Sequence, residues 1–569
     1  MESPLARHPG LLLRKVAERL RLRRDKAPLP RPTSTEIALP PHIRQSLENW
    51  AGMTVIEPGL HSFSKLFGQE FDEAELLMLC SSGPVTDARD LTADIKLIWD
   101  FSRAHPLFLN LCVSKDQVAA GAAFVRRWLK TNENTNGPAW TCAMDVAIRA
   151  TNWIAADAIS DGALGKQFGA REWAGWLWRH GAVIWRRLES RTIPSNHYLA
   201  DLVGLIALGA VFPNDSSARR WGRFGEQEFP RALIAQTHPD GGLNEASLRY
   251  HAFVTEMALV ARVFAGKPFP YAAEERIERM CQVLADFRDA HGDLFPFGDD
   301  DSGRVLALDH ASALGRADVL LKLAASIFGA QFAARPQAIY PDSGWWIHRS
   351  KDWAVAVEFG GVGLWGHGSH AHSDDLSFCL EWRGQPLIVD PGTYAYTWHP
   401  EARNRLRSIA AHNTLIIDGK DPLSPGPHLF HLPGPDRPWN IEPSESSCRF
   451  EREIEGRFRH QRMLQFRDLN TLVIEDEVLG EGSHELEWRF HFAPQWHLEA
   501  GPRHFIASSA SAPGLHLEVE SEKAALAVEQ AEFSVAYGVI EPCAVAIVTI
   551  KPTLPFGRRF TFHPAPGAR

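Results

Sequence analysis

Four short stretches of this chain gather residue types that can bind an anion, exchange a proton or ligate a metal. Each stretch adjoins a segment with a regular apolar pattern, so a folded element can hold its side chains in place. The stretches are SNHYLAD (195–201), HPDGGLNEASLRYHAF (238–253), GHGSHAHSDDLSF (366–378), and DPGTYAY (390–396) together with RNRLRSIAAHNTLIIDG (403–419).

Asn196, His197, Tyr250 and His370 suit the removal of a proton next to a carboxylate. In a uronic-acid glycan the C5 proton is only weakly acidic, and Asn or His can bind the adjacent carboxylate while an enolate-like intermediate forms. A His or Tyr can take the proton, and a Tyr hydroxyl, with a pKa of about 10 in water, can protonate the departing O4. These residues therefore indicate β-elimination. A structural alternative stays open at the first stretch, where Ser195 or Asn196 can simply cap the following helix.

His372, Asp390 and His412 form a second candidate group. LSFCLEW and QPLIVD are typical of a hairpin that turns at residues 383–384, and NTLIID of a third strand beside it. In such a meander the three side chains meet at one end of the sheet. Two imidazoles and a carboxylate are zinc-type ligands, with water available as a fourth. A hydrogen-bonded His–Asp–His network is the structural alternative, and the residue pattern leaves both open.

Two kinds of hydrophobic pattern divide the chain. From about residue 60 to 330, apolar residues recur at the i, i+3, i+4 spacing of amphipathic helices, as in CAMDVAIRATNWIAADAI. From about residue 343 the segments are short, β-branched and often alternating, as in WAVAVEFGG. We therefore predict a multidomain α+β protein. It has a basic arm and Pro-rich linker (1–44), a helical domain of antiparallel hairpins that can close into a toroid (45–340), and an antiparallel β-sandwich domain (341–569).

The bulk composition narrows the classes of function. The net charge of −9 argues against a nucleic-acid partner. The seven cysteines are scattered and form no CxxC, so neither a disulfide framework nor a cysteine zinc site is expected. The longest apolar run near the first residue is shorter than the roughly 7–15 residues of a signal-peptide core. We therefore expect a cytoplasmic protein, or a periplasmic one if the true start lies elsewhere, with a basic amphipathic arm exposed to solvent.

Six motifs, in this order, resemble those of the heparinase II/III family of polysaccharide lyases and the related alginate and oligo-alginate lyases. They are NHYLAD, DGGLNEASLRYH, FPFGDDDSGR, GSHAHSDDLSF, DPGTYAY and AAHNTLIIDG. The resemblance covers about residues 45 to 560. It implies an incomplete (α/α) toroid followed by antiparallel β-sheets, and cleavage of a uronic-acid-containing acidic polysaccharide or oligosaccharide.

The resemblance also implies roles for individual residues. Asn196, with His197, would bind the substrate carboxylate, and Tyr250 and His370 would be the catalytic tyrosine and histidine. The metal ligands would be His372, Asp390 and His412, holding a zinc ion with a structural role. Further candidates for substrate binding are Glu245, Arg249, His251, Tyr394, Arg405 and Arg407. Solvated surface arginines are the alternative for the last two, and we interpret GDDDSGR as a turn at the rim of the helical domain.

Other functions stay open at this point. A uronate C5-epimerase shares the first proton transfer but returns a proton instead of expelling O4. A glycoside hydrolase would need two carboxylates, for which Asp240 and Glu245 are available, but it would leave the Asn–Tyr–His set unexplained. A non-catalytic acidic-glycan-binding protein is the remaining reading. Members of the family that digest external polysaccharides usually carry an export signal, so its apparent absence favours an enzyme of imported oligosaccharides or of the cell's own acidic glycan.

Overall fold

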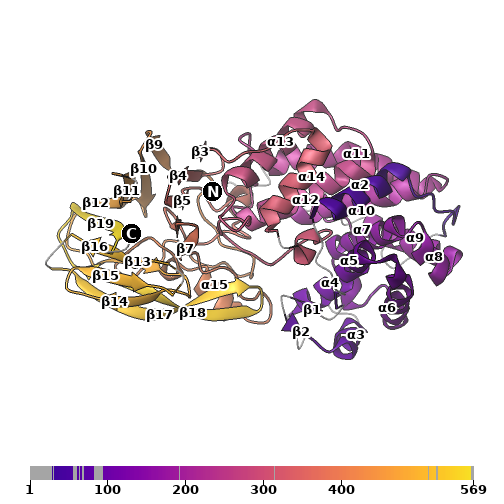
Figure 1. Ribbon diagram of the computed structural model, residues 1–569, viewed down its shortest axis with the longest axis horizontal. Coiled ribbons are helices and arrows are strands. Elements are labelled where there is room, and N and C mark those ends of the chain that lie inside the picture. Colours follow the sequence, from indigo (N-terminus) through magenta and orange to yellow (C-terminus); the bar gives the residue numbers. More distant parts are fainter. Residues whose placement is uncertain are drawn as a thin grey trace. The chain divides into compact units, whose positions relative to one another are not determined.

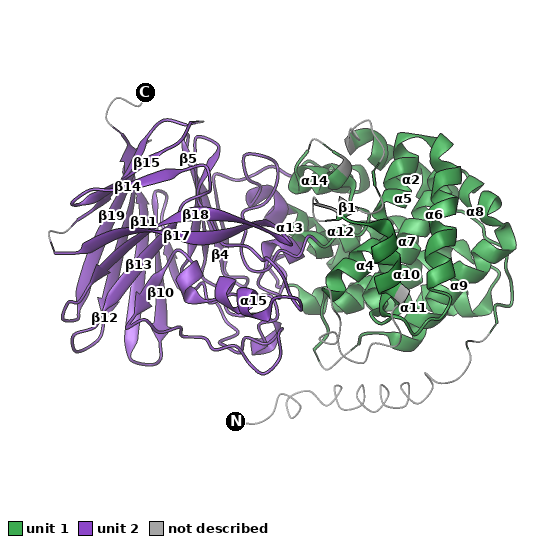
Figure 2. Cartoon of the chain, turned by 90° about the horizontal axis from the view of Figure 1, so that it is seen from below, with its two compact units in different colours: residues 1–237, 252–281, 303–331 green, residues 238–251, 282–302, 332–569 purple. Residues whose placement is uncertain are grey.

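The computed structural model describes residues 29, 31–54, 61–62, 65–66, 69–81, 94–190, 193–312, 314–468, 470–510, 512–520 and 523–565. The basic amphipathic segment predicted near the first residue lies outside this part of the chain. Two compact units are distinguished in Figure 2. Unit 1 comprises residues 1–237, 252–281 and 303–331, and unit 2 comprises residues 238–251, 282–302 and 332–569. Unit 2 thus includes two short segments from the stretch in which the sequence predicts helices.

Unit 1 is helical, as the apolar spacing predicts, and Figure 1 labels its elements. Helix α7 lies among α5, α9 and α10, and α10 also packs on α11. All 17 residues of α7 are buried because neighbouring helices surround it. The helices are α2 (Pro41–Thr54), α3 (Glu73–Ser81), α4 (Ile95–Arg103), α5 (His105–Val113), α6 (Val118–Thr131), α7 (Ala143–Ile159), α8 (Ala163–Phe168), α9 (Ala170–Arg187), α10 (Asn196–Val211), α11 (Ser216–Gln236), α12 (Leu248–Ala265), α13 (Tyr271–Asp286) and α14 (Arg316–Phe328). A short pair of strands, β1 (Lys65–Leu66) and β2 (Gln69–Glu70), lies between α2 and α3.

Tryptophan fills much of the unit 1 core. Trp128, Trp140 and Trp153 are fully buried, and the guanidinium of Arg149 lies 4.4 Å from the ring centroid of Trp128 and 4.6 Å from that of Trp140. Burial lowers the pKa of Arg149 to about 9. Stacking on aromatic faces partly offsets the cost of burying this charge. These tryptophans are therefore core residues and are not a sugar-binding surface.

Unit 2 consists mainly of antiparallel sheets. The three large ones run in the order β14-β15-β16-β19-β12-β11-β10-β9, β17-β18-β13-β8 and β3-β4-β5-β6-β7. Strand β11 alternates buried and more exposed residues, as expected for one face on a core. Strand β6 is buried at every position, so both of its faces are covered. Aromatic side chains such as Trp346, Trp488 and Phe560 join the sheets in one hydrophobic cluster.

The strands of unit 2 are β3 (Gln337–Tyr340), β4 (Trp345–Arg349), β5 (Trp353–Glu358), β6 (Phe378–Trp382), β7 (Gln385–Ile388), β8 (Leu415–Ile417), β9 (Asn440–Pro443), β10 (Ser447–Ile454), β11 (Phe458–Phe466), β12 (Leu472–Leu479), β13 (Leu486–His491), β14 (His497–Ala500), β15 (His504–Ser508), β16 (Leu515–Val519), β17 (Ala525–Ala536), β18 (Val539–Ile550) and β19 (Phe556–Pro564). A short helix, α15 (Pro400–Leu406), follows β7. Across the described residues, we find no helix with the length and apolarity needed to cross a bilayer.

A candidate active site and metal centre in unit 2

The carboxylate of Asp299 is the centre of a buried polar cluster in unit 2. Its Oδ2 accepts a hydrogen bond from His370 Nδ1 at 3.0 Å, and its Oδ1 one from His372 Nε2 at 3.1 Å. Arg403 donates to both oxygens, at 2.6 and 2.7 Å. The hydroxyl of Tyr396 donates at 3.3 Å. One carboxylate therefore orients two imidazoles and neutralises a buried guanidinium.

Tyr250 lies beside this cluster, in the first turn of α12. Its ring stacks on the imidazole of His370, with centroids 3.7 Å apart and planes inclined by 21°. The hydroxyls of Tyr250 and Tyr396 are 3.1 Å apart. On the far side of the His370 ring, Nε2 lies 3.4 Å from a carboxylate oxygen of Glu245. A phenol and an imidazole held side by side can act on neighbouring atoms of one substrate, one removing a proton and the other supplying one.

Electrostatics fix the charge state of this cluster. Burial alone would raise the pKa of Asp299, but Arg403 and the hydrogen bonds from His370 and His372 hold that pKa well below its ordinary value. Burial raises the pKa of Tyr250 well above that of a free tyrosine, and nearby carboxylates, including Asp299, raise it further. Tyr396 is raised in pKa for the same reasons. At neutral pH the carboxylate is therefore ionised while both phenols keep their protons.

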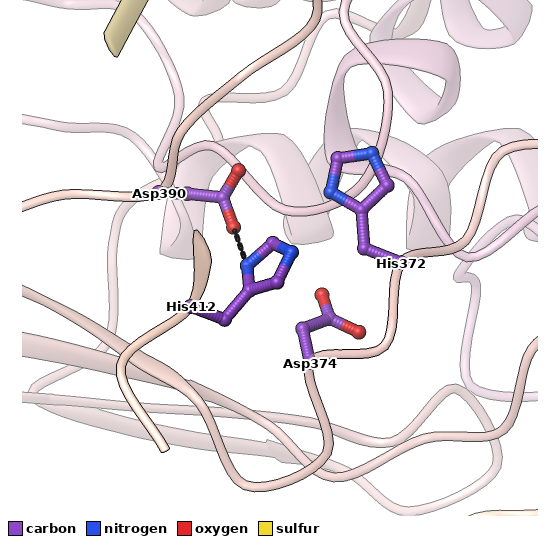
Figure 3. Close-up of side chains that lie close together, drawn as sticks. All are labelled: His372, Asp374, Asp390 and His412. Carbon is purple, nitrogen blue, oxygen red and sulfur yellow. Dashed lines mark hydrogen bonds and ion pairs between the residues drawn. The ribbon is translucent and has the colours of Figure 1, made fainter. Parts of the chain in front are cut away.

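A second group of side chains, drawn in Figure 3, has ligand atoms that all lie within 4.8 Å of one another: His372, Asp374, Asp390 and His412. Each imidazole forms a hydrogen bond to a carboxylate through one of its two nitrogens. His372 Nε2 faces Asp299, and His412 Nδ1 donates to Asp390 at 3.0 Å. The other nitrogens, His372 Nδ1 and His412 Nε2, are buried and have no hydrogen-bond partner among the described residues.

This pattern fits a metal-binding site. A metal-ligating histidine typically donates its second ring N–H to a carboxylate, which leaves the ligating nitrogen deprotonated. Two buried carboxylates also repel each other when no cation is near. Burial raises the pKa of Asp374 to about 6, and although His412 and His372 oppose the shift, Asp390 adds to it. A divalent cation would satisfy both the orphaned nitrogens and these carboxylates.

Comparison with known proteins assigns the chain to a family. The family model described as "Heparinase II/III N-terminus" matches residues 178–301, and "Heparinase II/III-like, C-terminal" matches residues 333–561. This chain belongs to the heparinase II/III family. The resemblance seen in its motifs is thereby confirmed, and the matched ranges contain the residues of both groups described above.

Individual relatives agree with this assignment. A heparin-sulfate lyase of Bacteroides stercoris is 24% identical over 316 residues, which are 52% of this chain and 45% of that protein. The match thus spans less than half of that relative's length. A structure of heparinase III aligns with a TM-score of 0.65 at 14% identity, covering 97% of this chain and 89% of that one. The heparan sulfate lyase of Pedobacter heparinus aligns with a TM-score of 0.58 at 16% identity, covering 93% and 89%. The predicted fold, an incomplete (α/α) toroid followed by antiparallel β-sheets, is confirmed.

The meander predicted around the metal ligands of this heparinase-family chain is wrong. Strands β6 and β7 do pair as a hairpin, but β8 pairs with β13 in another sheet. The chain between β7 and β8 forms α15 and a short 3-10 helix, so it does not turn directly back. In place of the expected strand pairing, side-chain hydrogen bonds of Asn413 join this segment to its neighbours. The amide of Asn413 donates to the carbonyls of Phe378 and Val389, at 2.9 and 2.8 Å. This contact holds the neighbouring His412 beside Asp390.

Asn196 and His197 belong to unit 1. Asn196 is buried at the first position of α10, and His197 Nδ1 lies 2.9 Å from Glu189 Oε2. Ser195 occupies the N-cap position, but its side chain accepts no capping hydrogen bond, so the capping explanation fails for that residue. The role of Asn196 and His197 in binding a carboxylate stays a prediction.

The remaining candidates have varied surroundings. Arg249 pairs with Asp293 and, at 3.4 Å, with Asp300, and His251 is fully buried. Arg405 forms an exposed ion pair with Glu532 at 2.6 Å.

Arg407 is buried and donates to Asn404 at 3.0 and 2.7 Å, and burial, aided by the positive charge of Arg403, lowers its pKa to about 10. The ring of Tyr394 lies 5.8 Å from that of His399. Substrate binding by these residues stays a prediction.

Asp299, Tyr396, Arg403 and Asp374 are residues of the two groups that sequence reasoning did not select. Asp374 follows a selected histidine by two residues, and its HSD context was a usable signal. Asp299 lies in the GDDDSGR segment that we interpreted as a turn at the rim of the helical domain. That interpretation is wrong for Asp299, because residues 282–302 group with unit 2 and its side chain is fully buried.

Proposed function

We propose that this protein is a polysaccharide lyase that cleaves a uronic-acid-containing glycosaminoglycan by β-elimination. The observation that carries the proposal is the stacked pair of Tyr250 and His370, with Nδ1 of the histidine held by Asp299. The family assignment and a curated relative named as a heparin-sulfate lyase support the substrate class. Two of the relatives named above are described as lyases, which favours elimination over epimerisation and over glycan binding without catalysis.

The proton transfers follow from the geometry. The acceptor Asp299 keeps a proton on His370 Nδ1, so Nε2 is the nitrogen that can take the C5 proton. Tyr250 keeps its proton because burial raises its pKa, so its hydroxyl can donate to O4 as the C4–O4 bond breaks. The products are a new reducing end and a sugar with a C4=C5 double bond.

Substrate binding and the cofactor complete the proposal. Asn196 and His197 bind the uronate carboxylate, which stabilises the negative charge that develops when C5 loses its proton. His372, Asp390 and His412 would hold a zinc-class ion, and Asp374, which the sequence did not suggest, would be the fourth protein ligand. When bound, the ion supplies a fixed positive charge that locks the loops carrying these ligands. Because His372 also donates to Asp299, the same loops position His370.

Ultraviolet absorbance with a panel of acidic glycans tests the reaction. The panel contains heparin, heparan sulfate, heparosan, hyaluronan, chondroitin, alginate, glucuronan and short oligomers of each. An unsaturated uronate absorbs where the intact sugar does not, so a lyase gives a rising signal. Tyr250→Phe should abolish that signal, whereas Tyr271→Phe, at a tyrosine that is 81% exposed, should keep it.

Two results would contradict the proposal. Exchange of solvent deuterium into C5 without chain cleavage would show epimerisation. Binding of a panel member with neither cleavage nor exchange would show a glycan-binding protein.

A further inference from the structure

A second set of metal-type ligands lies in unit 1 and shares no residue with the Asp299 and His372 groups of unit 2. Cys142, Glu189 and His197, here called the Cys142 cluster, offer a sulfur, a carboxylate oxygen and an imidazole nitrogen that lie within 4.8 Å of one another. The three residues come from separate segments: Cys142 precedes α7, Glu189 follows α9, and His197 is the second residue of α10. Figure 2 shows these helices in unit 1. No short motif joins the three residues, which explains why the spacing of cysteines gave no signal.

The distances between the ligand atoms are near those around a tetrahedral ion. Cys142 Sγ lies 3.4 Å from Glu189 Oε1 and 3.7 Å from His197 Nδ1, and Glu189 Oε2 lies 2.9 Å from the same nitrogen. Zinc bond lengths to sulfur, nitrogen and oxygen place neighbouring tetrahedral ligands about 3.3 to 3.6 Å apart. Only small side-chain shifts would let one ion contact all three. In a catalytic Cys–His–Glu arrangement, the thiol and the carboxylate contact different nitrogens of the imidazole. Here both contact Nδ1 of His197, so the geometry does not fit such an arrangement.

The cluster is held in place by its surroundings. Glu189 Oε1 accepts the backbone N–H groups of Ala143 and Met144, at 2.9 and 3.3 Å, in the first turn of α7. The backbone N–H of Glu189 donates to Asp201 at 2.6 Å. Cys142 is buried, while the side chain of His197 is 32% exposed and gives the cluster a side open to solvent. A pre-positioned ligand set with one exposed member can take up an ion without refolding.

We propose that the Cys142 cluster binds a divalent transition-metal ion of the zinc class, independently of the group around His372 in unit 2. Binding releases the thiol proton of Cys142 to solvent and forms the metal–thiolate bond. The nitrogen Nδ1 of His197 binds the ion through its lone pair, so any proton on Nδ1 leaves to solvent, and the neutral ring carries its proton on Nε2. The bound ion therefore fixes His197 as a hydrogen-bond donor at Nε2. Three protein ligands leave a fourth position for water.

A thiolate signal distinguishes the Cys142 cluster from the group around His372 in unit 2, because that group contains no sulfur. The protein is stripped with a chelator and titrated with cobalt(II), which gives an intense ligand-to-metal absorption band when a thiolate binds it. We expect this band in the full chain and its loss in Cys142→Ser, together with one fewer bound ion per chain. Cys112→Ser, at a half-buried cysteine elsewhere in unit 1, should keep the band. Asp390→Asn, which alters only the sulfur-free group, should keep it too.

Absorption-edge spectroscopy of the zinc-loaded, unmutated chain keeps the test valid if Cys142→Ser does not fold. A sulfur neighbour at about 2.3 Å from zinc is expected. Absence of both the cobalt band and a sulfur neighbour would overturn the proposal, and so would a band that survives in folded Cys142→Ser. Neither measurement uses a substrate, so their outcome does not depend on whether the protein is a lyase.

Discussion

Replacing Asp299 by Asn should destabilise unit 2 and abolish activity, for two separable reasons. The substitution keeps the shape of the side chain but removes the negative charge that pairs with Arg403 through two hydrogen bonds of 2.6 and 2.7 Å. Both side chains are at least 98% buried, so no solvent compensates the guanidinium. Breaking one partner of a buried ion pair typically costs about 3–5 kcal/mol. The amide also cannot accept hydrogen bonds from His370 and His372 with both of its terminal atoms.

The double variant Asp299→Asn, Arg403→Gln separates the two effects. Removing both charges leaves no unpaired ion, so the double variant should recover about 2–3 kcal/mol relative to the sum of the two single changes. Lyase activity should stay lost in both, because His370 is no longer held by a carboxylate. Hydrogen exchange at increasing urea, followed by mass spectrometry of peptides that contain residues 299 and 403, reports the stability of unit 2 itself. Additive losses in the double variant would refute the argument, and so would full activity in the single variant.

Three further predictions concern other parts of the chain. Tyr250→Phe should lower kcat by about 10²- to 10⁴-fold with little change in KM, as measured by product absorbance, because only the proposed proton donor is removed. His460 is fully buried and its pKa is lowered by burial to about 4, so the unfolded state binds a proton below pH 6.5 that the folded state does not. Stability should therefore fall from pH 6.5 to 4, and His460→Gln should remove up to about 1.4 kcal/mol per pH unit of that slope in urea unfolding; an unchanged slope would contradict this. His412→Asn should weaken zinc binding at the unit 2 group by more than the roughly 10- to 100-fold typical of an outer-shell change, as shown by metal analysis after dialysis. Wild-type zinc content in that variant would disprove the ligand assignment.

The element types were predictable because they depend on local periodicity. The buried α7 and the amphipathic α9 and α13 show helical spacing in the sequence, and the alternating β11 and β12 show a period of two. The partner of β8 was not predictable in the same way. Pairing between strands depends on which backbone groups a long connection leaves available, and α15 redirects the chain after β7.

The candidate site was predictable where motifs carry it and unpredictable where tertiary contacts do. Tyr250, His370 and the histidines of the metal group stand in recognisable stretches. The importance of Asp299 rests on contacts with His370, His372 and Arg403, which lie 71, 73 and 104 residues away. Nothing in the local GDDDSGR sequence distinguishes a surface turn from a buried counter-ion, because burial is a property of the assembled unit.

The interleaved path of the chain constrains how proteins with this fold can exchange parts. Segments 238–251 and 282–302, which contribute Glu245, Tyr250 and Asp299, belong to the same compact unit as residues 332–569. From the sequence pattern, a genetic crossover near residue 332 would join the helical part of one parent to the sheet part of another. It would pair the histidines and Arg403 of one parent with the tyrosine and carboxylates of the other. Hybrid proteins should therefore tolerate such crossovers only when both short segments are inherited together with the sheets.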